Sequence, residues 1–179
     1  DTKPAARLLN EDEFRPFDTA DTLQQASEAL ITSLEALAEE VAVGSVSDAG
    51  RRAALVPCTP TSDADEQCFR EFLEAFLPRA LRRAVTAEEV ASYLPLLAFA
   101  SEDNAVVDND FYTAVQLVVS AAVQDPEFLY RVEQGTPGAT PGLLELDDYE
   151  IANRMSYLLW ASMPDDALFA AAAAGDLRS

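Results

Sequence analysis

Apolar residues recur every three or four positions in several stretches of the chain, which is the spacing of one face of an α-helix. The clearest stripe predicts a helix over residues 22–43, with Asp21 or Thr22 as its cap. Gly44 is the expected stop of this helix, and a linker should follow over residues 44–63. The apolar positions of the stripe are Leu23, Ala26, Leu30, Leu34, Leu37 and Val41.

The same spacing predicts further helices downstream. One should start near Ala64 and break or kink at Pro78. The run Thr86-Ala87-Glu88-Glu89 is a capping box, so another helix should begin at Ala87. The remaining predicted helices cover residues 111–123, 127–133 and 147–162, and a last one ends at Gly175. Ion pairs four residues apart are expected between Arg70 and Glu74 and between Glu150 and Arg154.

The chain is therefore predicted to be all-α, with about five to seven helices in two groups, 21–133 and 146–177. A stretch rich in Gly and Pro, residues 134–143, is the clearest candidate boundary. The predicted divisions are a lead-in with the N-terminal helix (1–54), a helical module (55–134), a Gly/Pro linker (135–145) and the opening of a further helical module (146–179).

The last group should expose apolar surface when alone, because two short helices cannot bury their own faces. Its aromatic residues are therefore interpreted as core, or as a face that docks on another part of the protein, rather than as a cofactor lining. The candidate interaction surface consists of Tyr149, Tyr157, Trp160 and Phe169.

Charge and composition narrow the possible functions. The chain has 179 residues, with 12 basic and 32 acidic side chains, no histidine and a net charge of −20. The absence of histidine excludes a Ser-His-Asp triad, a Cys-His pair and a histidine-ligated zinc or haem within this chain. Binding to nucleic acid or to an anionic membrane surface needs clustered basic residues, so both partners are disfavoured. No apolar run approaches the ~20 residues of a membrane span.

Two cysteines, Cys58 and Cys68, are ten positions apart. Cys58 lies in a Pro-bounded loop and Cys68 in the first turns of a predicted helix, a placement that suits a disulfide. Two buried free thiols and a reactive thiol are the alternatives. A disulfide would imply an oxidising compartment, and therefore an extracytoplasmic location in the periplasm or at the cell surface.

Two clusters of charged residues could bind ions. The loop 102–110 offers carboxylate and amide oxygens, the ligands that calcium prefers, although it lacks the Gly and Glu of an EF-hand. Calcium is thus a possible cofactor, the alternative being a solvated loop. Its candidate ligands are Asp103, Asn104, Asp108 and Asp110. The basic cluster of Arg79, Arg82 and Arg83 could bind an anion, or could pair with acids on neighbouring helices.

Several stretches resemble a family of large exported proteins of planctomycete and myxobacterial type, assembled from domains of unknown function 1587, 1595 and 1592. The resemblance rests on the two cysteines with Phe69 and Phe72, on the Arg-rich segment 76–89, on Asp125-Pro126-Glu127-Phe128-Leu129-Tyr130-Arg131-Val132-Glu133, and on residues 146–177. It implies that the chain is an internal piece of an exported multidomain protein. It also implies the remainder of that protein, or a companion exported protein, as the partner.

These observations predict a non-catalytic structural or interaction segment that packs against the rest of its protein or a partner. The alternative is part of a periplasmic or surface enzyme, either cytochrome-linked or polysaccharide-active, whose catalytic residues lie outside this chain. No carboxylate pair suited to glycoside hydrolysis stands out among the acids. The chain has no Cys-x-x-Cys-His, so it cannot attach a c-type haem. Catalysis by this chain alone is therefore not expected.

Overall fold

The structure is a computed structural model that describes residues 28–103 and 106–178. Within these residues it contains eight helices and one small antiparallel hairpin, which confirms the all-α prediction. The helices are α1 (Glu28–Ser45), α2 (Ala49–Leu55), α3 (Glu66–Leu81), α4 (Ala87–Ser101), α5 (Phe111–Gln124), α6 (Pro126–Leu129), α7 (Asp148–Trp160) and α8 (Asp166–Ala174). The strands are β1 (Thr136–Pro137) and β2 (Leu144–Glu145).

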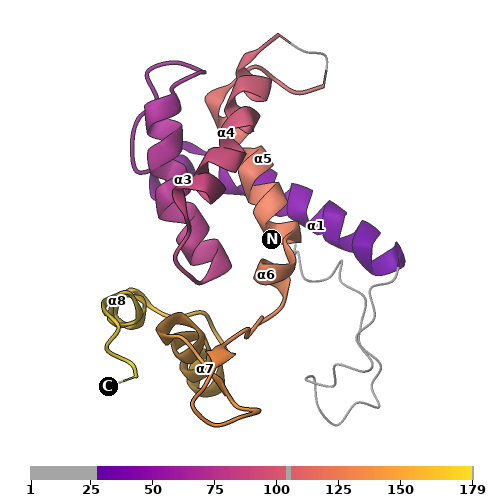
Figure 1. Ribbon diagram of the computed structural model, residues 1–179. Helices are drawn as coiled ribbons and strands as arrows, with labels where there is room; N and C mark the ends of the chain where they lie inside the picture. The colour runs from indigo at the N-terminus through magenta and orange to yellow at the C-terminus, as the bar shows by residue number, and fades with distance from the viewer. Residues whose placement is uncertain (1–27, 104–105, 179) are drawn as a thin grey trace.

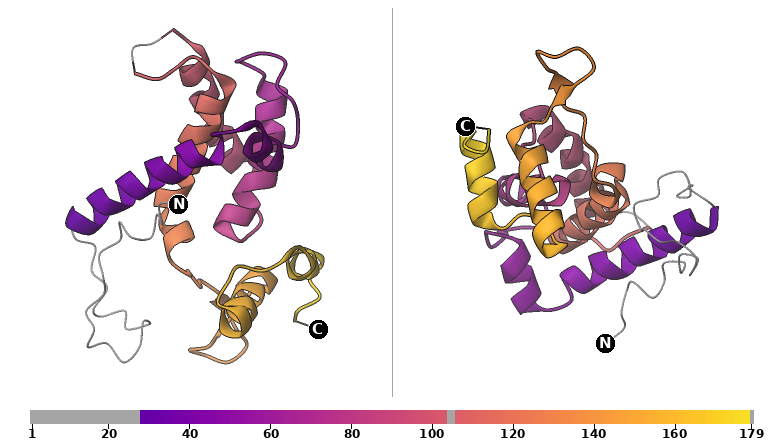
Figure 2. Two further views of the ribbon diagram at one scale, coloured as in Figure 1. Left: turned by 180° about the vertical axis from the view of Figure 1, so that it is seen from behind. Right: turned by 90° about the horizontal axis from the view of Figure 1, so that it is seen from below.

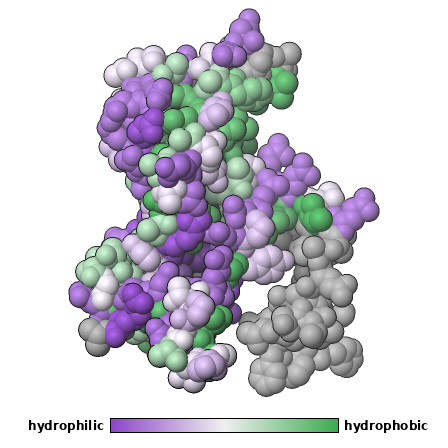
Figure 3. All heavy atoms as spheres, in the orientation of Figure 1, coloured by the Kyte–Doolittle hydropathy of each residue, from purple (hydrophilic) through white to green (hydrophobic). Residues whose placement is uncertain are grey.

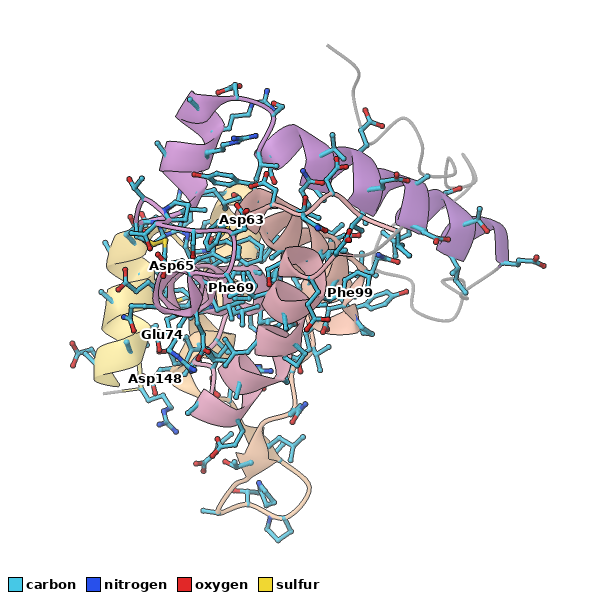
Figure 4. All side chains as sticks on the ribbon, turned by 90° about the horizontal axis from the view of Figure 1, so that it is seen from above. Asp63, Asp65, Phe69, Glu74, Phe99 and Asp148 are labelled. Carbon is cyan, nitrogen blue, oxygen red and sulfur yellow. A yellow bond between two sulfur atoms is a disulfide. The ribbon has the colours of Figure 1, made fainter. Side chains whose placement is uncertain are left out.

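Helix α5 forms the centre of the larger group of helices and contacts α1, α3, α4 and α6 (Figure 1). Its buried apolar residues recur every three or four positions, so that one broad face of the helix enters the core: Phe111, Ala114, Val115, Val118, Val119, Ala122 and Val123. Phe69 and Phe72 of α3 are fully buried, and Phe69 meets Phe111 edge to face at 6.0 Å between ring centroids. Phe69 lies in the interior of this group in Figure 4. Close packing of these rings against α5 makes this the main core of the molecule.

The ends of the helices follow the caps that the sequence indicates. Thr86 and Glu89 form the expected capping box at the start of α4. Asp65 caps α3 by accepting the backbone N–H of Cys68 at 3.0 Å, and Gly175 ends α8 in the left-handed conformation. Pro78 does not break α3, which continues to Leu81. Pro78 has no backbone N–H, so the helix loses one hydrogen bond there. The helix continues because burial of Leu77, Ala80 and Leu81 in its last turn compensates for this loss.

The N-terminal segment differs from the prediction at the end of the first helix and in the linker that follows it. The proposed caps at Asp21 and Thr22 lie outside the described residues. Gly44 does not stop α1, which ends at Ser45; the Arg51 guanidinium donates to the Gly44 carbonyl at 2.7 Å. The expected linker instead contains α2, whose N-cap Asp48 accepts the Arg51 N–H at 2.9 Å. A helix of seven residues is too short to show an apolar stripe.

The last part of the chain forms a smaller group of helices, in which α7 packs on α8 (Figures 1 and 2). Tyr149 and Phe169 meet edge to face at 5.2 Å, and Ala152, Ser156 and Ala172 are buried. The chain reaches this group through α6, which ends at Leu129 rather than at the expected residue 133. The connector then forms the β1–β2 hairpin, with Thr136 paired to Glu145.

Hydrophilic side chains cover much of the face shown in Figure 3, with hydrophobic ones visible between them.

The ion pairs that the sequence suggested have different partners. Arg70 pairs with Glu66 at 3.0 Å rather than with Glu74, which puts the acid N-terminal to the base, the favoured order on a helix. No helix of the described part of the chain is long and apolar enough to cross a membrane.

Candidate functional site

The junction between the two groups of helices is built around Arg82, the residue that ends α3. Arg82 is 6% exposed and adopts a left-handed backbone conformation, with φ of 56°. Its guanidinium donates to the carbonyls of Phe128 at 3.1 Å and Tyr130 at 3.0 Å, and also to that of Glu127. These are carbonyls at the C-terminal end of α6, which the helix itself leaves without partners. Arg82 thus fixes α6 on the end of α3.

Arg83 bridges the start of α4 to α6. Its guanidinium pairs with Glu89 at 2.6 Å and with Glu127 at 2.7 Å, and these hydrogen bonds raise its own pKa. The hydrogen bond from Arg83 and the backbone N–H of Thr86 lower the pKa of Glu89 to about 2. Arg79 pairs with Asp166 of α8, so two members of the basic cluster, Arg79 and Arg83, pair with acids on neighbouring helices, whereas Arg82 binds backbone carbonyls.

Glu150 holds the connector against α7. Its Oε1 accepts the backbone N–H groups of Gln134 at 2.6 Å and Gly135 at 3.0 Å, and its Oε2 accepts that of Asp147 at 2.9 Å. Burial raises the pKa of Glu150, but these hydrogen bonds outweigh it, so the pKa lies below its ordinary value. The expected hydrogen-bonded pair between Glu150 and Arg154 does not form, because Arg154 instead pairs with Glu133 at 3.0 Å.

A groove of about 830 Å³ runs along this junction. One wall is the end of α3 with the segment from Glu127 to Thr136, and the other wall is α7. Arg82, Arg83, Arg131 and Arg154 line it together with Glu127, Glu133, Asp147 and Glu150. Its apolar lining includes Val132 and Leu158, which are 48% and 80% exposed. A chain of net charge −20 therefore contains a locally balanced groove.

Apolar side chains on α7 continue from this groove onto the surface. Leu158 is 80% exposed, Trp160 66%, Leu159 62% and Met155 41%. We call these four residues the α7 apolar face. Of the predicted interaction residues, Trp160 belongs to this face. Tyr149 and Phe169 pack on each other between α7 and α8, and Tyr157 is half-buried beneath the Arg131 guanidinium. The interaction role of all four stays a prediction.

Cys58 and Cys68 form a disulfide, which confirms that alternative over free thiols. It ties the loop after α2 to the first turn of α3, remote from the groove in the sequence. A disulfide is typical of proteins in oxidising compartments.

The candidate calcium loop is described only in part, since Asn104 lies outside the described residues. Asp110 is the N-cap residue of α5 without a side-chain hydrogen bond to that helix. Among the residues that the structure describes, no three or more His, Cys, Asp or Glu side chains are grouped so as to hold a metal ion. Calcium binding by Asp103, Asp108 and Asp110 stays a prediction.

Three acids at or near this junction have lowered pKa values. A general acid needs a carboxyl group whose pKa is raised. The pKa values of Glu89 and Glu150, beside the groove, are lowered by hydrogen bonds, as is that of Asp148, whose carboxylate accepts from Arg178 and Leu177. Burial raises the pKa of Asp148, but these bonds and the Arg178 charge outweigh it. These acids are thus held as ion-pair partners and helix caps.

Two of these roles, those of Arg82 and Asn153, could not be predicted from local sequence pattern. The sequence places Arg82 only in a basic cluster. Its role is hidden because the carbonyls that it binds are 45 to 48 residues away, too far to form a local pattern. No sequence pattern predicted a role for Asn153, whose side-chain amide donates to the Arg82 carbonyl at 3.1 Å. The end of α6 at Leu129, where Arg82 caps the helix, could not be predicted from the sequence for the same reason.

Comparison with known proteins gives two matches. Residues 68–133 match the model of PSD5, described as "Protein of unknown function (DUF1595)". Residues 146–179 match that of PSD4, described as "Protein of unknown function (DUF1592)". No curated protein and no solved structure matches the chain. The groove thus has one wall in each matched stretch, and over these two stretches the chain is similar to the DUF1595 and DUF1592 families of proteins of unknown function.

Proposed function

We propose that this chain is a non-catalytic interaction segment of a larger exported multidomain protein, and that it packs through the α7 apolar face against the rest of that protein or a companion. The observation that carries the proposal is the exposure of three consecutive large apolar residues, Leu158, Leu159 and Trp160, at the end of one helix. Contiguous apolar side chains of this kind, rimmed by polar groups, mark contact surfaces in soluble proteins.

The surroundings of the face support a docking role. The helices that carry it are tied to the rest of the structure: Asn153 bonds to Arg82, Arg154 pairs with Glu133, and Arg79 pairs with Asp166. A surface held by such contacts is preorganised, which lowers the ordering cost of binding. Tandem matches to two families support a place within a multidomain protein. The disulfide supports export, since such bonds persist in oxidising compartments.

The division of the chain at residues 135–145 is part of the same proposal. The two family matches lie on either side of this connector. Export and the nature of the partner rest on the arguments above together with the resemblance. An enzyme whose catalytic residues lie outside this chain stays the alternative, and the described residues offer no observation that favours it.

The direct test is association in trans between this chain and the remainder of its parent protein, measured by analytical ultracentrifugation. Leu158→Asp and Trp160→Asp should each weaken association at least tenfold, because each puts a charge into an apolar contact. Ile31→Asp is the matched control, since Ile31 is likewise an exposed apolar residue, 58% exposed, on another helix. No association, or equal losses in all three variants, would contradict the proposal.

A further inference from the structure

Arg131 differs from every other arginine in residues 28–103 and 106–178. Each of the others donates a hydrogen bond to a carboxylate or a backbone carbonyl. Arg131 makes no such bond within the described part of the chain; its one directed contact places the guanidinium 5.0 Å from the centroid of the Tyr157 ring. Among the arginines of the described residues, Arg131 alone has a guanidinium with no hydrogen-bond acceptor.

Arg131 lines the groove at the junction, and the acids that share this groove already have donors. Glu127 accepts from Arg83, and Glu133 accepts from Arg154. Glu150 accepts from the backbone of the connector. The five N–H donors of Arg131 are therefore available to a group that enters from outside, and they match a carboxylate in two-pronged geometry.

Asn153 also lines this groove, beside exposed apolar side chains. The Oδ1 of Asn153 is a buried acceptor without a hydrogen-bond partner in the described residues, because its amide nitrogen is directed to the Arg82 carbonyl. A buried acceptor of this kind is completed by an N–H donor or a bridging water. Val132 and Leu158 add exposed apolar surface in the same groove.

We propose that this groove binds an extended peptide segment of the partner, with a carboxylate that pairs with Arg131 and apolar side chains that cover Leu158 and Val132. This inference rests on the proposed function and names the chemistry of its partner. The groove, about 830 Å³, has the size of sites that enclose small ligands and short peptide stretches.

The net charge of −20 does not exclude an acidic segment. The four arginines of the groove are matched by four acids, so the local charge is balanced. Charges elsewhere on the surface are screened beyond about 8 Å at physiological ionic strength. The attraction between an acidic segment and Arg131 therefore depends on the charges inside the groove.

The test uses three peptides and the complete 179-residue chain. The first peptide is Ala-Leu-Glu-Leu-Ala with blocked ends, the second has Gln in place of Glu, and the third is the Gln peptide with a free C-terminal carboxylate. Binding is followed by NMR through the Arg131 side-chain N–H and the Leu158 methyl groups. The first peptide should bind at least tenfold more tightly than the second and shift both signals. The third shows whether a chain terminus can supply the carboxylate instead of a side chain.

Arg131→Gln should remove the preference for the Glu peptide, and Arg51→Gln should retain it. Arg51 is a matched control, because it is an exposed arginine far from the groove in the sequence, with its side chain 61% exposed. Equal affinity for the blocked Glu and Gln peptides, shifts outside the groove, or an unchanged preference in Arg131→Gln would overturn the inference. If the chain still associates with its parent protein in trans while no peptide binds at millimolar concentration, the inference fails and the proposed function stands.

Discussion

The side-chain amide of Asn153 donates a hydrogen bond to the backbone carbonyl of Arg82, which lies 3.1 Å away and 71 residues earlier in the sequence. Through its own guanidinium, Arg82 holds three carbonyls at the end of α6. One residue therefore joins the ends of α3 and α6 to α7. This small polar hub, rather than a shared apolar core, positions the smaller group of helices on the larger one.

Replacement of Arg82 by Met should destabilise the protein by about 2 kcal/mol or more, because it leaves partly buried carbonyls of α6 without donors. Met keeps much of the apolar stem, so lost packing contributes little. The free energy of unfolding from urea denaturation measures the effect. The control Arg70→Met removes an exposed pair with Glu66 and should cost less than about 0.5 kcal/mol. Equal costs for the two variants would show that Arg82 is not a hub.

Stability should depend on pH through Glu89. Its pKa is lowered to about 2 in the folded protein, so its ionised form is stabilised by folding. This contribution is present above its ordinary pKa of 4.5 and is lost as the pH falls from there to about 2. In Glu89→Gln the fall in melting temperature over this pH interval should become shallower. Glu88→Gln, which removes an exposed carboxylate from the same helical turn, is the matched control.

Gly135 should be hard to replace. Its φ is +55°, and a Cβ there would lie 2.9 Å from the Cβ of Leu144 and 3.1 Å from the Glu145 carbonyl oxygen. Gly135→Ala should therefore open the hairpin and speed hydrogen exchange of the Gln134 amide, which donates to Glu150. Gly142→Ala is the matched control, since Gly142 also has a positive φ, of +86°, but nothing lies within 4 Å of its Cβ position. Equal exchange in both variants would argue that backbone strain alone matters.

Reduction of the Cys58–Cys68 disulfide should destabilise the protein by about 3 kcal/mol, the loss expected for a short closed loop in the chain-entropy model. The Cys58→Ser/Cys68→Ser double variant should show a similar loss without reductant. Urea denaturation with and without dithiothreitol measures the first, and the double variant should no longer respond to dithiothreitol. Two titratable thiols in the unreduced denatured protein would contradict the bond.

The fold was largely predictable because its signals are local. The capping box at Thr86 and Glu89, the stop at Gly175 and the stripe of α5 each involve residues within a few positions of one another. The helix α2 was missed because seven residues cannot display a periodic stripe. The break expected at Pro78 does not occur, because burial of the last turn of α3 outweighs the hydrogen bond that proline removes.

The groove was not predictable, because its contacts join residues far apart in the sequence. Arg82 meets residues 127–130, and Arg154 meets Glu133 instead of the helical neighbour that its spacing suggested. Trp160, by contrast, was among the residues singled out, since two short helices cannot cover their own apolar side chains. Local pattern therefore pointed to the exposed Trp160 but not to the polar hub, and the interaction role of the four predicted residues stays a prediction.

The most direct test of the interaction account is carbene footprinting of Trp160 and Met155 in this chain alone and in the complete parent protein. Trp160 is the chain's single tryptophan, 66% exposed, so its labelling reports on the α7 apolar face. The account predicts strong labelling of both residues in the isolated chain and marked protection in the complete protein, with Ile31 labelled equally in both. Equal labelling of Trp160 and Met155 in the two samples would contradict it.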